Sequence, residues 1–248
     1  GASTEEAQLN VSVAVARQLV DFFATGTIKN AVNVPSVSRE ALDQMEPYIH
    51  LTERLGSFIG QTYEGGIEEV HIEYLGGAGE FESLQPLTVA ALKGLLEPIL
   101  GEKVNFVNAP VLAKERGVRI VESRSTESRD FASLIRIRAL GGGGEHLVCG
   151  TIFGRRYPRI VRIDNFYLEA RAGGHIIVMH NKDKPGVVGA VGQLLGSNGI
   201  NIAHMQLGLD NEKREAMALI QIDEPAPDEV IGKFAALANV IWVKQIEL

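Results

Sequence analysis

The order of segments after Gly173 constrains the fold of this chain more than any other feature of its sequence. Apolar runs of strand type and two helical patterns alternate there. The predicted strands are 175–180, 201–209, 215–222 and 240–246, and the predicted helices are 185–198 and 227–237. This β-α-β-β-α-β order is that of a ferredoxin-like domain, in which two helices cover one face of a four-stranded antiparallel sheet. We expect the other face and the edges to be available to a partner, and we interpret Gly189 and Gly192 as sites of close helix–sheet packing.

The region before Gly173 predicts a second domain of mixed helices and strands. Its predicted helices are 45–61, 86–100 and 109–116, and its predicted strands are 67–76, 118–123, 133–140, 146–153, 159–163 and 166–170. Four glycines at 141–144 predict a turn between strands. Residues 1–24 predict a helix with Ser3 and Glu6 as a capping box, and 30–38 predict an extended connector around Pro35. The predicted fold class is α+β or α/β, with domains at 1–38, 39–172 and 173–248.

Charge and cysteine usage restrict the classes of function. The 31 acidic and 24 basic residues give a formal net charge of −7, whereas a general nucleic-acid binder needs a basic face. No apolar stretch is long enough to span a bilayer. The single Cys149 lies in the apolar run HLVCGTIF, so we interpret it as a buried thiol of a cytoplasmic protein. Because the sequence has no metal-ligand spacing, nucleophile–base signature, dinucleotide loop or phosphate loop, we expect no catalytic group, metal or cofactor in this chain.

Polar residues bracket the predicted helix in HNKDKPGVVGAVGQLLGSNGINI, residues 180–202. Pro185 suits a first helical turn, just before Gly186, and Asp183 is placed to accept from the unpaired N–H groups there. The same N–H groups can bind the carboxylate of a small molecule. Oxygens of Asn181 and Asp183 would then hold its ammonium group, with Asn201 close to both. A local helix cap and a ligand site are both open interpretations of these residues.

A second group of candidates is basic. Two strands that we expect to pair, together with the turn before them, carry Arg155, Arg156, Arg159, Arg162 and Arg171. Guanidinium groups suit carboxylate and phosphate, so these residues predict either an anion site or a solvated surface.

Taken together, these segments resemble the C-terminal part of a long-type D-3-phosphoglycerate dehydrogenase. The resemblance covers essentially the whole chain and is carried by GASTEEAQLNVSVAVARQLVDFFATGTIKNAVNVP, PLTVAALKGLLEPILGEKVNFVNAPVLAKERG and RIVRIDNFYLEARAGGHIIVMHNKDKPGVVGAVG. It implies an intervening, or allosteric substrate-binding, domain followed by an ACT domain. It also implies that the family's NAD-binding domain and catalytic His, Glu and Arg precede this chain. We therefore expect the chain alone to be inactive and to bind no NAD.

The resemblance further implies a regulatory and assembly role in the first step of serine biosynthesis. In this family ACT domains pair side by side through a sheet edge and the first helix, and the effector L-serine binds at that interface. Asn181 and Asp183 match the serine contacts before the Pro-Gly of Pro185 and Gly186, and Asn201 matches the Asn of the second strand. Positions matching Arg159 and Arg171 form an anion site in some relatives.

These matches imply a homo-oligomer, assembled through the ACT and intervening domains, that responds allosterically to a small amino acid. Two other functions stay open. One is a stand-alone interaction protein that dimerises through an ACT-type sheet and binds no effector. The other is the regulatory chain of an iron–sulfur L-serine dehydratase, which has the same two domain types; the opening helix and NAVNVP favour the dehydrogenase.

Overall fold

The computed structural model of the protein describes residues 4–25, 39–128, 130–154 and 156–248. The chain divides into two compact units, Gly1–Glu46 and Pro47–Leu248. In the first unit, α1 (Glu5–Thr25) is preceded by Thr4, whose hydroxyl accepts a 3.2 Å hydrogen bond from the N–H of Ala7. The predicted capping residue Ser3 and the predicted connector 30–38 lie outside the described residues.

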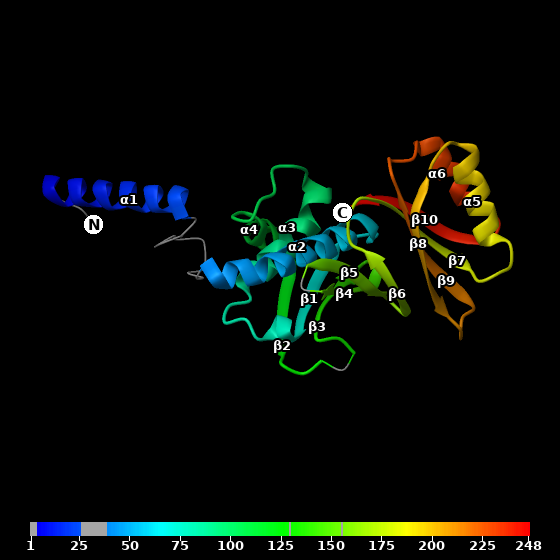
Figure 1. Ribbon diagram of the computed structural model, residues 1–248, viewed down its shortest axis with the longest axis horizontal. Helices are drawn as coiled ribbons and strands as arrows, with labels where there is room; N and C mark the ends of the chain where they lie inside the picture. The colour runs from blue at the N-terminus through cyan, green and yellow to red at the C-terminus, as the bar shows by residue number, and fades with distance from the viewer. Residues whose placement is uncertain (1–3, 26–38, 129, 155) are drawn as a thin grey trace. The chain divides into compact units, whose positions relative to one another are not determined.

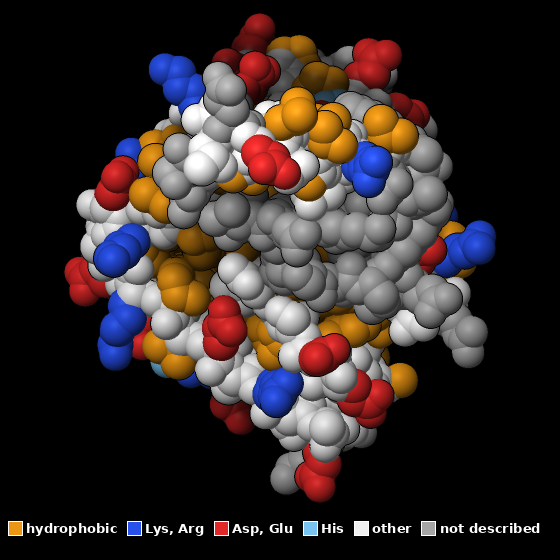
Figure 2. Space-filling model, turned by 90° about the vertical axis from the view of Figure 1, so that its left-hand side faces the viewer, with side chains coloured by type: hydrophobic (Ala, Val, Ile, Leu, Met, Phe, Trp, Pro, Cys, Tyr) orange, Lys and Arg blue, Asp and Glu red, His pale blue; other side chains and the backbone are white. Residues whose placement is uncertain are grey.

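The helix α1 carries exposed apolar side chains. They are Leu9, Val11, Val13, Val15, Leu19 and Val20. On the face shown in Figure 2, acidic and basic side chains of the described residues are interspersed among apolar ones.

A six-stranded sheet forms the first part of the second unit (Figure 1). Its strands are β1 (Ile67–Gly76), β2 (Arg119–Ser125), β3 (Ser133–Gly141), β4 (Gly144–Phe153), β5 (Tyr157–Ile163) and β6 (Phe166–Arg171). Their order is β2-β1-β3-β4-β5-β6, with β1 and β2 parallel and every other pair antiparallel. Gly141 pairs with Gly144, so the glycine run makes the predicted turn between strands.

Three helices accompany this sheet, and two of them cross closely. They are α2 (Arg39–Thr62), α3 (Gln85–Leu100) and α4 (Ala109–Glu115). A Cβ added to Gly56 of α2 would lie 2.1 Å from the carbonyl oxygen of Ala91, and one added to Gly94 of α3 would lie 1.9 Å from that of Glu53. Glycines on both helices therefore permit the crossing. The helix α2 begins six residues before the predicted Met45, because the apolar pattern that predicted it lies after Pro47.

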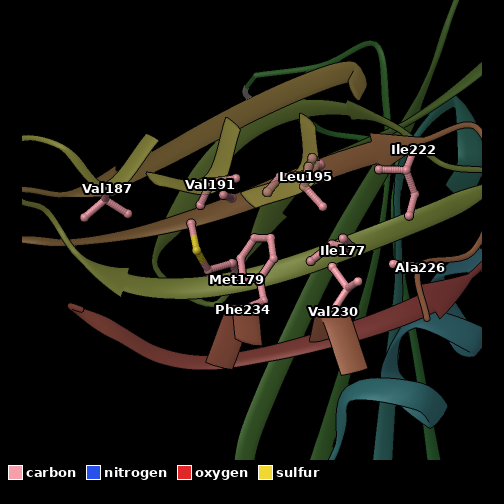
Figure 3. Packing of buried hydrophobic residues seen from close by; sticks show 11 residues of the cluster. Ile177, Met179, Val187, Val191, Leu195, Ile222, Ala226, Val230 and Phe234 are labelled. Carbon is pink, nitrogen blue, oxygen red and sulfur yellow. The ribbon is translucent and has the colours of Figure 1, made fainter. Parts of the chain in front are cut away.

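The second part of this unit is a ferredoxin-like domain with a four-stranded sheet of order β10-β7-β9-β8. Its elements are β7 (His175–Lys182), α5 (Val187–Ser197), β8 (Ile202–Asp210), β9 (Glu215–Ile222), α6 (Asp228–Ala235) and β10 (Val240–Glu247). Figure 3 shows the core, in which Val191 and Leu195 of α5 and Phe234 of α6 pack over Ile177 and Met179 of β7. The predicted β-α-β-β-α-β order is confirmed.

The helix-free face of this sheet packs against β6 of the same chain. Phe166 on β6 meets the ring of His180 edge-to-face, with 5.3 Å between centroids. Gly208 on β8 is required at this contact, since a Cβ there would lie 2.7 Å from the carbonyl oxygen of Tyr167. The expectation that the whole free face is available to a partner is therefore wrong.

A side chain also occupies part of one sheet edge. The Gln61 amide at the end of α2 donates to the carbonyl of Glu247 at 2.7 Å and accepts from its N–H at 3.0 Å. Lys244 donates to the carbonyl of Thr62 at 3.2 Å. The carboxyl-terminal half of β10 is thus held by α2 rather than left open.

Candidate functional site

The loop between β7 and α5 differs from the predicted helix cap. The helix begins at Val187, its N-cap is Gly186 with φ +93°, and no side chain caps it within the described chain. Asp183 is exposed, and its backbone N–H donates to the carbonyl of Arg214 at 2.8 Å. Both predictions that placed Pro185 in the first turn and Asp183 at the cap are wrong, because the left-handed Gly186 turns the chain before the helix starts.

Asn181 is buried at the end of β7. Its side chain is 3% exposed, and its Nδ2 donates to the carbonyl of Lys182 at 2.8 Å. Its Oδ1 is buried and has no hydrogen-bond donor among the described residues. Buried acceptors without a donor are uncommon in folded proteins, so this atom marks a place where a donor is missing.

Asn201 lies at the opposite end of the same sheet. On β9, Asn181 faces Ala216, whereas Ile202, the neighbour of Asn201, faces Ile222. Ala216 and Ile222 are six residue steps apart along β9, a distance of about 20 Å. The expectation that Asn201 approaches Asn181 and Asp183 is therefore wrong within one chain, since α5 carries the chain back along the sheet. The Asn201 amide instead donates to the Asp223 carboxylate at 2.8 Å.

The outward face of α5 is built of small residues. No atom lies within 4 Å of a Cβ built on Gly189, Gly192 or Gly196. The interpretation of Gly189 and Gly192 as helix–sheet packing sites is therefore wrong, because the space beside them is open. Val188 is 50% exposed on the same helix.

Two leucines of the edge strand β8 also face solvent. Leu207 is 42% exposed and Leu209 is 50% exposed. In register, Leu207 and Leu209 face Ala218 and Ala216 of β9, which places them at the Asn181 end of the sheet. Together with Val188, they are exposed apolar side chains of this domain.

The structure brings Arg159 and Arg171 together, as residues paired across β5 and β6. Both line a cavity of about 210 Å³ beside β8 and β9, which is also lined by His204, Gln206 and Gln221. The Nε of Arg159 lies 3.6 Å from a Glu169 carboxylate oxygen.

The other basic candidates do not join this pair. Arg162 stacks on the ring of Tyr167, 4.9 Å from its centroid, and donates to the Asp164 carbonyl at 2.6 Å. Arg159 and Arg171 line this cavity and a second hollow, described below, and Arg156 lines neither of them. Arg155 lies outside the described residues.

Sequence reasoning missed Arg54 and Gln221. Both line a second hollow of about 640 Å³ that also contains Arg159 and Arg171. Arg54 comes from α2 and Gln221 from β9, so tertiary packing alone places them beside β5 and β6. No local sequence pattern near either residue signals a site.

Comparison with known families decides what these domains are. Residues 44–164 match the family model described as the D-3-phosphoglycerate dehydrogenase intervening domain, and residues 175–239 match the ACT domain model. The chain contains an intervening domain of the D-3-phosphoglycerate dehydrogenase type, followed by an ACT domain. The predicted domain limits at residues 38 and 172 stay predictions.

Relatives named D-3-phosphoglycerate dehydrogenase match along the whole chain. The Synechocystis protein is 37% identical over 240 residues, which are 97% of this chain and 43% of that protein. The Archaeoglobus fulgidus protein is 36% identical and the Bacillus subtilis protein 32% identical, each over 100% of this chain and 47% of its own length. The chain therefore spans about half the length of the curated relatives it matches, and it corresponds to their C-terminal regulatory part.

Other candidate chemistry is sparse in the described parts of the two domains. Cys149 in the intervening domain is a free thiol, 2% exposed, and burial raises its pKa. The interpretation of Cys149 as a buried thiol is confirmed. Among the described residues, no three His, Cys, Asp or Glu side chains gather as metal ligands. Within the same residues, no helix combines the length and the apolar character needed to cross a bilayer.

Proposed function

We propose that the chain is the regulatory part of a D-3-phosphoglycerate dehydrogenase whose ACT domains pair and bind a small amino acid, L-serine, between two copies. The observation that carries the proposal is that α5 places Asn201 at the opposite end of the sheet from Asn181 and Asp183. A site that uses all three residues needs a second chain, and so pairing and ligand binding become one event.

The loop after β7 offers groups for both ends of an amino acid. The start of α5 has no side-chain cap, so its N–H groups and the positive end of the helix dipole suit a carboxylate. Asp183 offers a negative charge to the ammonium group nearby. The unpartnered Oδ1 of Asn181 is an acceptor in the same loop region. A small rearrangement of this buried amide would let its Oδ1 accept a hydrogen bond from the ammonium group.

Twofold pairing across α5 supplies the third group. In an isologous pair, the first turn of α5 in one copy meets the last turn of α5 in the other. Asn201 follows the end of α5 by a few residues, so the partner's Asn201 comes to the loop of the first copy. The proposed site therefore contains Asn181 and Asp183 from one chain and Asn201 from its partner.

The surface around α5 suits such a pairing. Gly189, Gly192 and Gly196 let another backbone approach closely, because no side chain stands between them and solvent. The exposed Val188, Leu207 and Leu209 would gain burial from the same contact. The edge of β8 lies on this side of the sheet, whereas part of the β10 edge is taken by Gln61.

Calorimetric titration with L-serine tests the effector site. Serine should bind the wild type, and Asp183→Ala and Asn201→Ala should each weaken binding about ten- to a hundred-fold, as for loss of one hydrogen bond to a charged group. Asp228→Ala, at the start of α6, is a matched control that should bind normally. Failure of serine to bind any of these chains would leave an ACT-type interaction protein without an effector.

A mixing experiment tests the sharing of the site. When Asp183→Ala and Asn201→Ala chains are unfolded together and refolded, half of the pairs are mixed, and each mixed pair has one intact site. About a quarter of the wild-type number of sites should then return. Recovery of none would mean that both residues serve the same chain or that the chains do not pair.

We also propose that Arg159 and Arg171 bind an anion at the junction of the two domains. The support is their pairing in register beside a cavity that the ACT sheet completes. Phosphate should raise the melting temperature by mass action, and Arg159→Ala should abolish that gain. An equal gain in Arg119→Ala and in Arg159→Ala would mean a nonspecific salt effect.

A further inference from the structure

The connector between the two domains is held by side chains from both of them. Arg54 of the intervening domain donates from Nη1 to the carbonyl of Ala172 at 2.5 Å. Gln221 of the ACT domain donates from Nε2 to the carbonyl of Gly173 at 2.6 Å. Gly174 exchanges two backbone hydrogen bonds with Leu248, at 2.8 and 3.1 Å. Consecutive carbonyls of the connector are thus fixed by opposite domains.

The residues that hold the connector also line a groove of positive charge. Arg54 and Gln221 lie in the wall of the 640 Å³ hollow with Arg159 and Arg171. Three guanidinium groups and no carboxylate line this groove among the described residues. Glu169, the acid beside Arg159, lines the neighbouring smaller cavity instead. Three cations without a lining acid favour an anion that carries more than one negative charge.

We propose that Arg54 is a positioning residue that couples occupancy of this groove by a multivalent oxyanion to the order of the domain connector. The proposal rests on the anion site proposed for Arg159 and Arg171. A guanidinium has five N–H donors in a planar fork, so Arg54 can hold the Ala172 carbonyl and an anion at the same time. An anion bound to Arg159 and Arg171 alone contacts only β5 and β6.

Contact with Arg54 extends the effect of the anion to the connector. The anion fixes the guanidinium, the guanidinium fixes the carbonyl of Ala172, and Gln221 holds the next carbonyl from the other side. Occupancy would therefore restrain how the ACT domain is attached to the intervening domain.

Hydrogen exchange of the connector amides, residues 172–176, tests the coupling, with inorganic phosphate as the probe and calorimetry as the separate measure of binding. If exchange requires the anion to leave, phosphate at ten times its Kd should slow exchange of the wild type about ten-fold. Arg54→Lys keeps the positive charge but loses the fork, so it should still bind phosphate while its connector exchange no longer responds. Arg159→Ala should lose binding and response together, and Arg119→Lys should behave as wild type.

Each other outcome decides against the inference in a distinct way. A full response in Arg54→Lys would show that the connector is ordered without this side chain. If Arg54→Lys loses both phosphate binding and the exchange response of the connector, Arg54 is an anion ligand only. Absence of phosphate binding to the wild type would overturn the anion site itself. If Arg54→Lys does not fold, Arg54→Gln, which also lacks the guanidinium fork, should still bind phosphate through Arg159 and Arg171 while its connector exchange no longer responds, and a full response would reject the coupling.

Discussion

Replacing Gly94 with Ala should destabilise the intervening domain although Ala is the better helix former. The added Cβ would lie 1.9 Å from the Glu53 carbonyl oxygen and 2.9 Å from the Ser57 nitrogen, where ordinary contact begins at 3.4 Å. The shortfall at the carbonyl is about 1.5 Å, the difference of these two distances, and backbone atoms cannot rotate away. Overpacking costs about 1–3 kcal/mol, and the upper end applies because α2 and α3 must separate. Higher helix propensity offsets about 1 kcal/mol, which leaves a net loss of about 2 kcal/mol.

Thermal unfolding followed by circular dichroism measures this effect. A loss of about 2 kcal/mol in a chain of this size lowers the melting temperature by about 4–8 °C. Gly232→Ala in α6 is the matched control, since no atom lies within 4 Å of its added Cβ. That control should gain about 0.5–1 kcal/mol. A Gly94→Ala chain that melts at or above the wild-type temperature would refute the close crossing of the two helices.

Three further predictions concern single side chains. Because burial raises the pKa of the Cys149 thiol, Ellman's reagent at pH 8 should label the folded chain far more slowly than the urea-unfolded chain. The stability that the neutral thiol contributes is present below the ordinary thiol pKa. The free energy of unfolding should therefore fall as pH rises past that value, and it should fall more in the wild type than in Cys149→Ala. Tyr74→Phe removes the buried 2.9 Å hydrogen bond to Thr88 and should cost about 1–2 kcal/mol in urea unfolding, partly restored by Thr88→Val. Gly192→Leu fills the open face of α5, so it should leave helicity intact but shift light scattering to the monomer mass; an unchanged mass would exclude α5 from the pairing surface.

Local patterns were sufficient for most of the fold and insufficient for the site. Alternating and helical apolar runs placed the strands and helices of both sheets, because the side chains that face a core must follow the period of their element. The start of α5 was misplaced since Pro185 suits a first turn, whereas the left-handed Gly186 delays the helix by two residues. The backbone conformation of a glycine is not visible in its sequence neighbours.

The failures at the candidate site arise from distance along the chain. Asn201 and Asn181 are separated by one helix in sequence, but that helix runs the length of the sheet and puts them at opposite ends. Arg54 precedes Arg159 by more than a hundred residues, and only the packing of α2 beside the connector brings both into one groove. Such placements depend on tertiary packing, which residue spacing does not encode.

The pairing of the Gln61 amide with Glu247 has a consequence for assembly. A sheet that offers two open edges can add copies at both and grow into a fibre, whereas a sheet with one blocked edge stops at two. Here a side-chain amide from α2 takes the place of a neighbouring strand at the end of β10, which closes that part of the edge to strand addition. If ACT domains pair as proposed, Gln61→Ala should free the N–H and carbonyl of Glu247 for a further strand, and light scattering should then detect assemblies larger than those of the wild type.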